Sequence, residues 1–262
     1  MMHLLFIGDV VGKTGRNSLR QCLPGIYENY RIDLTIANGE NSAGGAGITH
    51  AVYVELRNMG IDVITGGNHS WDQKEVLDFI DHEPGLIRPA NYPPDTTPGE
   101  GSVVIEPASG GPRIAVINLI GRVFMRHADC PFRTADREIS LLKDKADFIV
   151  VDFHAEATSE KEALGWYLDG RVSAVIGTHS HVQTADERIL PAGTAYITDV
   201  GMAGLYNSIL GVDKEGPLQR FLTQMPHKLT ISEGKKVFNA VIIELDEKSG
   251  KAIAIERIYR II

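Results

Sequence analysis

Short apolar runs recur along the chain, and each of them stops abruptly at glycine or at a polar residue. Near-continuous runs of this kind are typical of parallel strands that are buried on both faces of a sheet. They predict strands at residues 4–7, 34–37, 63–65, 114–119, 148–153 and 174–176. Segments with helical spacing lie between them, at residues 16–30, 49–58, 73–80, 135–145 and 160–168. The alternation of strands and helices indicates an α/β fold.

Strand patterns dominate the end of the chain, so its last part is expected to be more antiparallel. The predicted strands cover residues 195–198, 228–231, 237–245 and 252–262, with a hairpin loop at 246–250. No internal repeat or low-complexity linker divides the sequence, and we expect a single domain over residues 1–262. Residues 120–134 contain a loop long enough to serve as a lid or an interface segment.

Composition excludes several classes of protein. The 43% hydrophobic and 23% charged content of the 262 residues is that of a soluble globular protein, not of a disordered, collagen-like or coiled-coil chain. The net charge of −8 argues against an extended nucleic-acid partner, which normally requires a basic surface. Two cysteines are too few for a disulfide framework, and no apolar run has the length of a membrane span. We therefore expect a cytoplasmic protein that does not enter a membrane.

Metal-ligating residue types stand at the carboxyl ends of five predicted strands. In open α/β sheets the ligand site lies at this edge. The set combines carboxylates, carboxamides and imidazoles without a thiolate, which suits Mn, Fe or Zn. Its members are Asp9, Glu40, Asn41, Asn68, His69, His154, His179 and His181.

The number of these residues favours two metals. One metal with open positions needs about three or four protein ligands, and the seven residues other than His69 fit two metals about 3.5–4 Å apart. Taken singly, Asp9 and Asn68 also read as turn residues and His154 as a packing residue. The ordered set, with two imidazoles in Gly-Thr-His-Ser-His at residues 177–181, is what predicts a metal site.

The order of these motifs resembles the calcineurin-like metallophosphoesterases and, within them, the bacterial YmdB-type phosphodiesterases. The resemblance is carried by Gly-Asp at 8–9, Asn-Gly-Glu-Asn at 38–41, Gly-Gly-Asn-His at 66–69 and residues 177–181, 198–202 and 211–215. The chain departs from the broad superfamily at three positions. Val11 stands where a histidine ligand is usual, Glu40 where the bridging aspartate is usual, and Ser70 where an acid usually follows Gly-Asn-His. The YmdB-type subgroup implies the second exchange, with Asn41 replacing the missing histidine.

The resemblance implies a four-layer α/β/β/α sandwich with mixed sheets and a binuclear metal centre. One metal would be held by Asp9, Glu40, Asn41 and His181, and the other by Glu40, Asn68, His154 and His179. The ions would be Fe and/or Mn, with Zn or Mg as alternatives. A hydroxide bridging them would attack phosphorus, and His69 would protonate the leaving group as a general acid.

The implied substrate is a small nucleotide phosphodiester, such as a cyclic mononucleotide. We also expect a homo-oligomer. At the end of a central strand, Asn118 and Arg122 are candidates to line the substrate pocket, and His127 lies in a loop that could cover the site.

Three other interpretations remain open at this point. The first is a nucleotide-sensing regulator that retains the metal site without turnover. The second is a P-loop nucleotide hydrolase, because residues 8–14 end in Gly-Lys-Thr; the loop is one residue short, and Ile7 stands where the first glycine should be. The third is a metal-dependent peptidase, although the chain lacks a His-Glu-x-x-His helix.

Overall fold

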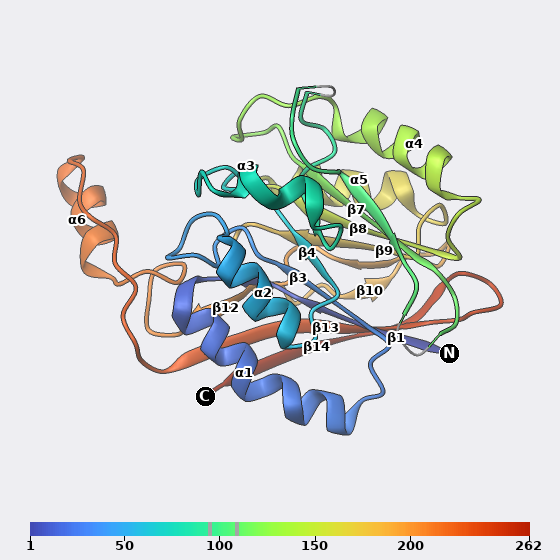
Figure 1. The fold of residues 1–262 in the computed structure, drawn as a ribbon, viewed down its shortest axis with the longest axis horizontal. Helices are drawn as coiled ribbons and strands as arrows, with labels where there is room; N and C mark the ends of the chain where they lie inside the picture. Colours follow the sequence, from blue (N-terminus) through green and yellow to red (C-terminus); the bar gives the residue numbers. More distant parts are fainter. Residues whose placement is uncertain (94–95, 108–109) are drawn as a thin grey trace.

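Two sheets packed face to face form the centre of the molecule, and helices cover the outer face of each (Figure 1). The computed structural model describes residues 1–93, 96–107 and 110–262. Within these residues the layers follow the order helix, sheet, sheet, helix. The predicted four-layer α/β/β/α sandwich is therefore confirmed.

The first sheet contains eight strands in the described part of the chain, in the order β2-β12-β13-β1-β3-β4-β5, with β14 on the free side of β13. Strands β1, β3, β4 and β5 run parallel, whereas β13 is antiparallel to β1 and β14 to β13. The strands are β1 (Met2–Ile7), β2 (Asp9–Val10), β3 (Leu34–Asn38), β4 (Val63–Thr65), β5 (Leu86–Ile87), β12 (Met202–Leu205), β13 (Lys236–Leu245) and β14 (Ala252–Ile261).

The second sheet contains six described strands in the order β10-β11-β9-β8-β7-β6. Strands β7, β8, β9 and β11 run parallel, and β6 and β10 are antiparallel at the two edges. The strands are β6 (Ser102–Ile105), β7 (Ile114–Ile120), β8 (Phe148–His154), β9 (Ala174–Thr178), β10 (Arg188–Ile189) and β11 (Ala195–Ile197).

Alternation along the central strands explains why they appear as continuous apolar runs. Along β1, Leu4 and Phe6 face the second sheet, whereas Leu5 and Ile7 face the helices that cover the first. Because successive side chains point to opposite faces, a strand between two apolar layers needs apolar residues at every position. The buried runs thus fix the strands in the middle of the sandwich.

Six helices accompany the sheets in the described residues: α1 (Gly12–Asn29), α2 (His50–Asn58), α3 (Val76–Phe79), α4 (Pro131–Leu142), α5 (Thr158–Leu168) and α6 (Glu215–Thr223), with a 3-10 turn, η1 (Ile80–His82). Helix α2 begins as predicted, since the Thr49 side chain accepts the Val52 N–H at 3.3 Å. Helix α1 starts earlier than predicted and continues through Pro24. Helix α6 projects from the body at the left of Figure 1.

Two local predictions are wrong. Residues 228–231 form no strand; this segment lies in the arm after α6, where Thr230 and Ser232 bond Asp213 instead of a neighbouring strand. The loop at 120–134 is shorter than expected, because Pro131 begins α4. Its role as a lid and the single-domain organisation stay predictions. None of the described helices combines the length and apolar character needed to cross a bilayer.

Candidate metal centre

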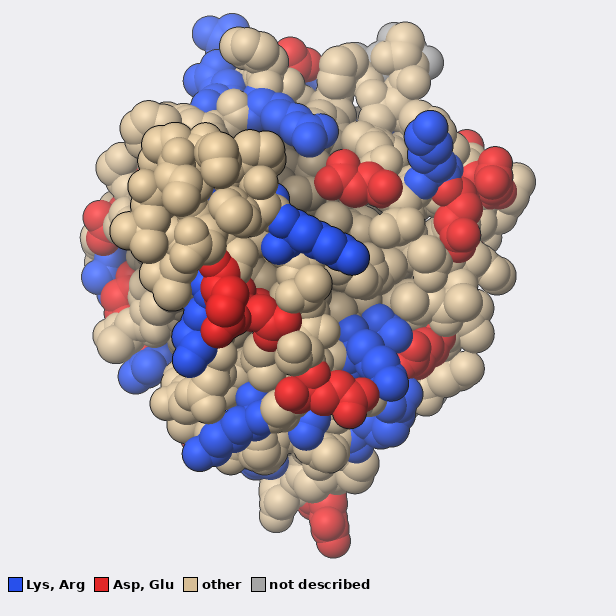
Figure 2. Space-filling model, turned by 90° about the vertical axis from the view of Figure 1, so that its left-hand side faces the viewer, with Lys and Arg blue, Asp and Glu red and all other residues tan. Residues whose placement is uncertain are grey.

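Strand ends from both sheets meet at one edge of the sandwich. Asp9 follows β1, Glu40 and Asn41 follow β3, and Asn68 follows β4. From the second sheet, His154 ends β8, and His179 and His181 follow β9. Figure 2 views the molecule from the side on which α6 projects, where the visible Lys and Arg side chains are interspersed with Asp and Glu rather than gathered into a basic track. This agrees with the acidic net charge.

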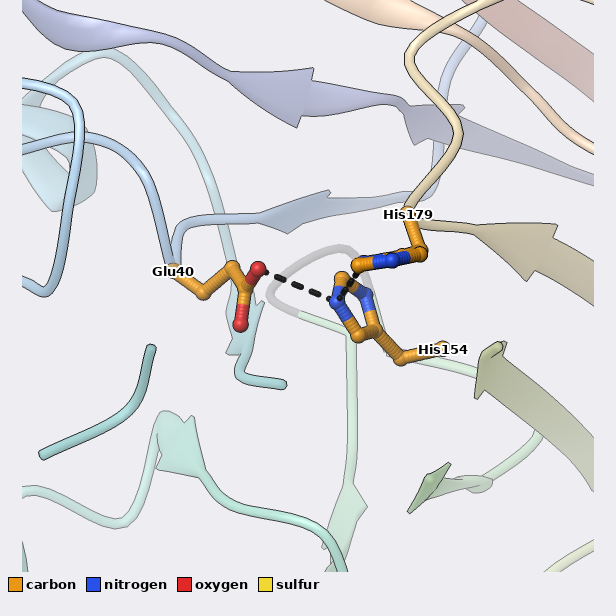
Figure 3. Close-up of side chains that lie close together, drawn as sticks. All are labelled: Glu40, His154 and His179. Atoms are coloured by element: carbon orange, nitrogen blue, oxygen red, sulfur yellow. Dashed lines mark hydrogen bonds and ion pairs between the residues drawn. The ribbon is translucent and has the colours of Figure 1, made fainter. Parts of the chain in front are cut away.

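The Nε2 atom of His154 is the centre of the first group of ligand atoms. Glu40 Oε1 lies 3.0 Å from it, Asn68 Oδ1 3.1 Å and His179 Nδ1 3.0 Å. Figure 3 shows the Glu40 carboxylate and the His179 ring approaching His154 from different elements. A single proton on Nε2 can form a hydrogen bond with only one of these three atoms. The lone pairs of all of them point to one place, and this arrangement of lone pairs is typical of a cation site. Glu40, His154 and His179 offer ligand atoms within 4.8 Å of one another.

A second group of polar atoms adjoins the first through Glu40. Asp9 Oδ1 lies 3.5 Å from His181 Nε2. The Asn41 amide is 3.4 Å from Asp9 Oδ1, 3.3 Å from Glu40 Oε1 and 3.3 Å from His181 Nε2. Rotation of the terminal amide by 180° exchanges its nitrogen and oxygen. The oxygen, which can bind a cation, then occupies the position from which these distances are measured. All seven predicted ligands therefore contact at least one other member of the set.

Gly67 leaves room for the side chains of two candidate ligands. A Cβ at this position would overlap the Glu40 carboxylate and the His154 ring. The donor atoms around it are oxygen and nitrogen, as Mn, Fe and Zn accept. The residues present thus fit a pair of divalent cations.

The electrostatics of the buried groups are strongly coupled. Burial lowers the pKa of His154, but the Glu40 and Asp9 carboxylates outweigh it and raise that pKa to about 9. Burial also opposes ionisation of Asp9 and Glu40, yet His181 and His154 hold the pKa of Asp9 below its usual range, and His154 does the same for Glu40. Burial and the neighbouring His154 lower the pKa of His179 to about 4. The site thus concentrates buried carboxylates that are held in the ionised form, which favours a cation.

A layer of polar side chains beneath the ligands orients His154. Its Nδ1 atom lies 2.9 Å from Thr178 Oγ1, and Thr178 donates to Asp152 Oδ1 at 2.7 Å. Burial raises the pKa of Asp152 to about 6. Such partners fix the orientation of a ligating imidazole. Sequence reasoning missed Asp152, although a carboxylate inside an otherwise apolar strand was a usable signal.

His69 lies beside the ligand groups and differs from them in exposure. Its backbone N–H donates to Glu40 Oε2 at 2.8 Å, which places it next to the centre. Its ring is half-exposed, and Nδ1 lies 2.6 Å from Asp72 Oδ2. Among the described residues, Nε2 has no hydrogen-bond partner. Asp72, the acid nearest to the motif in sequence, orients this ring.

Asn118 takes a different place from that expected. Asn118 is fully buried and accepts the Gly66 N–H at 3.2 Å, so it supports the turn before Asn68 and cannot line a substrate pocket. Arg122 is exposed, its backbone N–H donates to Glu160, and its place in a substrate pocket stays a prediction. His127 is exposed as well, and its role in covering the site stays a prediction.

The P-loop interpretation does not fit the backbone. The N–H groups of Asp9, Val11 and Gly12 donate to the carbonyls of residues 201, 203 and 41, so they are not free to hold phosphate. Lys13 is exposed and pairs with Glu233 at 3.1 Å.

Comparison with known proteins identifies relatives over the whole chain. The family model described as YmdB-like protein matches residues 5–258. A protein of Bacillus subtilis (strain 168), described as a 2',3'-cyclic-nucleotide 2'-phosphodiesterase, is 52% identical over 98% of this chain and 96% of its own length. A crystal structure described as a novel phosphatase of Mycoplasma pneumoniae shares 37% identity with a TM-score of 0.92, covering 99% of this chain and 93% of that one.

A more distant structural match concerns the fold alone. The 5'-nucleotidase of Candida albicans SC5314 aligns with a TM-score of 0.58 at 14% identity, over 98% of this chain and 50% of that protein. The sandwich described above is thus shared with metallophosphoesterase-fold proteins.

Proposed function

The chain belongs to the YmdB-like family, and from that premise we propose that it is a metal-dependent phosphodiesterase that hydrolyses small nucleotide phosphodiesters. The observation that carries the proposal is the convergence of Glu40, Asn68 and His179 on one nitrogen of buried His154. Asp9, Asn41 and His181 continue this group on the other side of Glu40. A binuclear arrangement of this kind suits in-line displacement at phosphorus.

The residues divide into two ligand sets that share Glu40. Asp9, Glu40, Asn41 and His181 would hold one cation, and Glu40, Asn68, His154 and His179 the other. Fe and/or Mn suit this mixture of oxygen and imidazole ligands, with Zn or Mg as alternatives. Bound cations supply Lewis-acid charge to the phosphoryl oxygens and lower the pKa of a nucleophilic water.

His69 provides the proton for the departing alkoxide. Its Nδ1 atom is occupied by the Asp72 carboxylate, so the proton is delivered from Nε2. The Asp72 contact also fixes the ring in one orientation. The short connection from the His69 N–H to Glu40 keeps the donor beside the ligand groups.

The substrate class we propose is the 2',3'-cyclic mononucleotides. The relative of 52% identity carries that activity in its description and aligns over nearly the full length of both chains. The interspersed charges of the face in Figure 2 and the net charge of −8 suit a small ligand better than a polynucleotide. The predicted homo-oligomer stays a prediction.

Metal-loaded protein assayed with a panel of substrates tests this function. Protein purified without chelators, and then supplied with Mn²⁺ or Fe²⁺, is expected to hydrolyse 2',3'-cyclic AMP and bis-p-nitrophenyl phosphate. Protein that binds the nucleotide but turns over neither substrate would instead support the sensor interpretation. Metal analysis of the same sample identifies the native ions.

A further inference from the structure

A pocket of about 340 Å³ lies next to the candidate metal centre. Its lining is mostly apolar and aromatic, with Val182, Met202, Tyr206, Leu210, Val237 and Tyr259 among its residues. Several of these side chains are exposed although they are large, including Tyr259 at 53% and Leu210 at 50%. Apolar pockets with a few polar groups are the usual form of small-molecule sites.

One imidazole ring separates this pocket from the ligand groups. His181 lines the pocket, while its Nε2 atom faces Asp9 and Asn41. Its Nδ1 atom lies 2.9 Å from the carbonyl of Leu210, on the pocket side. The pocket and the candidate ligand groups therefore lie on two sides of the same side chain.

Strand β13 links the pocket to the same sheet edge. The carbonyl of Asn239 accepts the N–H of Gly8, the residue before Asp9, at 3.1 Å. Asn239 lines the pocket, and Tyr259, which pairs with it between β13 and β14, lines it as well. Both residues thus stand beside the strand end that presents Asp9.

The Asn239 carboxamide is a polar group available in the pocket. Asn239 is only 3% exposed, yet among the described residues its side chain has no hydrogen-bond partner. In the same lining, Gln183 donates through Nε2 to three backbone carbonyls, so this amide is held by the chain itself. The carboxamide atoms of Asn239 therefore keep access to solvent, and a polar ligand in the pocket can hydrogen-bond them.

A nucleobase matches this combination of groups. A carboxamide offers one donor and one acceptor side by side, which can pair with the edge of a base, as asparagine does with adenine. Tyrosine rings provide faces on which a base stacks. Tyr206 and Tyr259 both line the pocket and are both partly exposed.

We propose that this pocket, the base pocket, holds the nucleobase of the substrate, with Asn239 hydrogen-bonding the base edge and the two tyrosines contacting its faces. The inference rests on the proposed function and extends it to the part of the substrate that does not react. In a 2',3'-cyclic nucleotide only the ribose separates the phosphate from the base. In the protein only the His181 ring separates the ligand groups from the base pocket.

The role of the base pocket is tested by comparing a substrate that has a nucleobase with one that has none. Mn²⁺-loaded protein is assayed with 2',3'-cyclic AMP and with bis-p-nitrophenyl phosphate, which has no nucleobase, and the ratio of the two kcat/KM values is compared among variants. In Asn239→Leu and Tyr259→Ala we expect this ratio to fall about 10-fold, mainly through a higher KM for the nucleotide. The matched control is Ile253→Ala, on the same strand as Tyr259 and 48% exposed, which should keep the parent ratio.

A binding measurement makes the test independent of turnover. Adenosine, which lacks the phosphate, should bind the parent protein in calorimetry and bind Tyr259→Ala about 10-fold more weakly. Equal losses on both substrates, or an unchanged ratio with unchanged adenosine binding, would overturn the base pocket. A parent protein that hydrolyses neither substrate would overturn the proposed phosphodiesterase instead, and adenosine binding would still report on the pocket.

Discussion

Lys161 and Asp199 form a buried ion pair directly behind the loop that carries two of the candidate ligands. Lys161 Nζ donates to Asp199 Oδ2 at 2.7 Å, and that oxygen also accepts the N–H of Ser180 at 2.9 Å. Ser180 lies between His179 and His181, whose φ angles of 97° and 63° fall in the left-handed region. This backbone conformation is unfavourable for non-glycine residues and persists where the surroundings hold it. The Asp199 carboxylate is such a restraint.

Removal of the Asp199 carboxylate should strongly destabilise the protein. Asp199→Ala leaves the Lys161 ammonium buried without its partner, and we expect a loss of about 3–5 kcal/mol in the free energy of unfolding, measured by urea denaturation. Asp136→Ala is the control, because Asp136 pairs with Arg171 at the surface and should cost about 0–1 kcal/mol. Similar losses in both variants would contradict the importance of the buried pair.

A methyl group at Gly67 should disrupt the metal centre. Its Cβ would overlap the Glu40 carboxylate and the His154 ring, so we expect Gly67→Ala to bind metal far less tightly than the parent. Metal content after gel filtration measures this. In Gly25→Ala, by contrast, the new methyl group meets no atom within 4 Å, so metal content should be retained and helix α1 stabilised by about 1 kcal/mol. Full metal occupancy in Gly67→Ala would be incompatible with a centre at this place.

Replacement of His69 should affect turnover and leave metal binding intact. A general acid contributes about 10²–10⁴-fold, so kcat of His69→Ala on a poor leaving group should fall within that range. Asp72→Asn should give a smaller loss, because the ring stays in place but loses the carboxylate at Nδ1. The assay uses 2',3'-cyclic AMP, with metal content measured on the same samples. Undiminished turnover in His69→Ala would remove this residue from the mechanism.

Withdrawal of metal should lower stability as well as activity. The ligands bring carboxylates and imidazoles together in the folded chain only, so a cation that binds there stabilises the native state, by about 2.7 kcal/mol at a concentration 100 times its Kd. Dialysis against a chelator should abolish hydrolysis and lower the thermal midpoint, and Mn²⁺ should restore both. A thermal midpoint that does not respond to either treatment would argue against a site in the folded protein.

Asp186 should make stability depend on pH in the acid range. Burial opposes its ionisation, but hydrogen bonds from Thr184 and Thr198 outweigh it and hold its pKa below the usual value of 3.8. Because the folded-state pKa is depressed, this stabilisation is present above pH 4 and is lost as the pH falls through the folded pKa. Asp186→Asn should therefore cost about 1 kcal/mol at pH 7, after allowance for solvent screening, and less at pH 3. Urea unfolding at the two pH values measures the difference, which would be absent if the carboxylate had no role.

Local patterns in the sequence determined the central strands and the order of the ligand motifs. The strand at residues 63–65 was predicted at its observed bounds, and Thr49 caps its helix as expected. Both depend on interactions over a few residues: apolar side chains at every position of a strand buried on both faces, and a hydroxyl that accepts a nearby N–H. Residues 228–231 have a sequence that favours a strand, but no neighbouring strand pairs with them in the described structure, so the prediction of a strand there was wrong.

Only the tertiary structure decided which distant residues support the site. Lys161 and Asp199 are 38 positions apart, and nothing in their local sequence indicates that they meet behind His179 and His181. Asp152 and Asn239 likewise gain their meaning from neighbours on other strands. The sequence predicted the candidate ligand set, since parallel strands bring their carboxyl ends to one edge. The register of the two sheets, set by packing across the whole core, determined which polar side chains were buried against that edge and which faced the adjoining pocket.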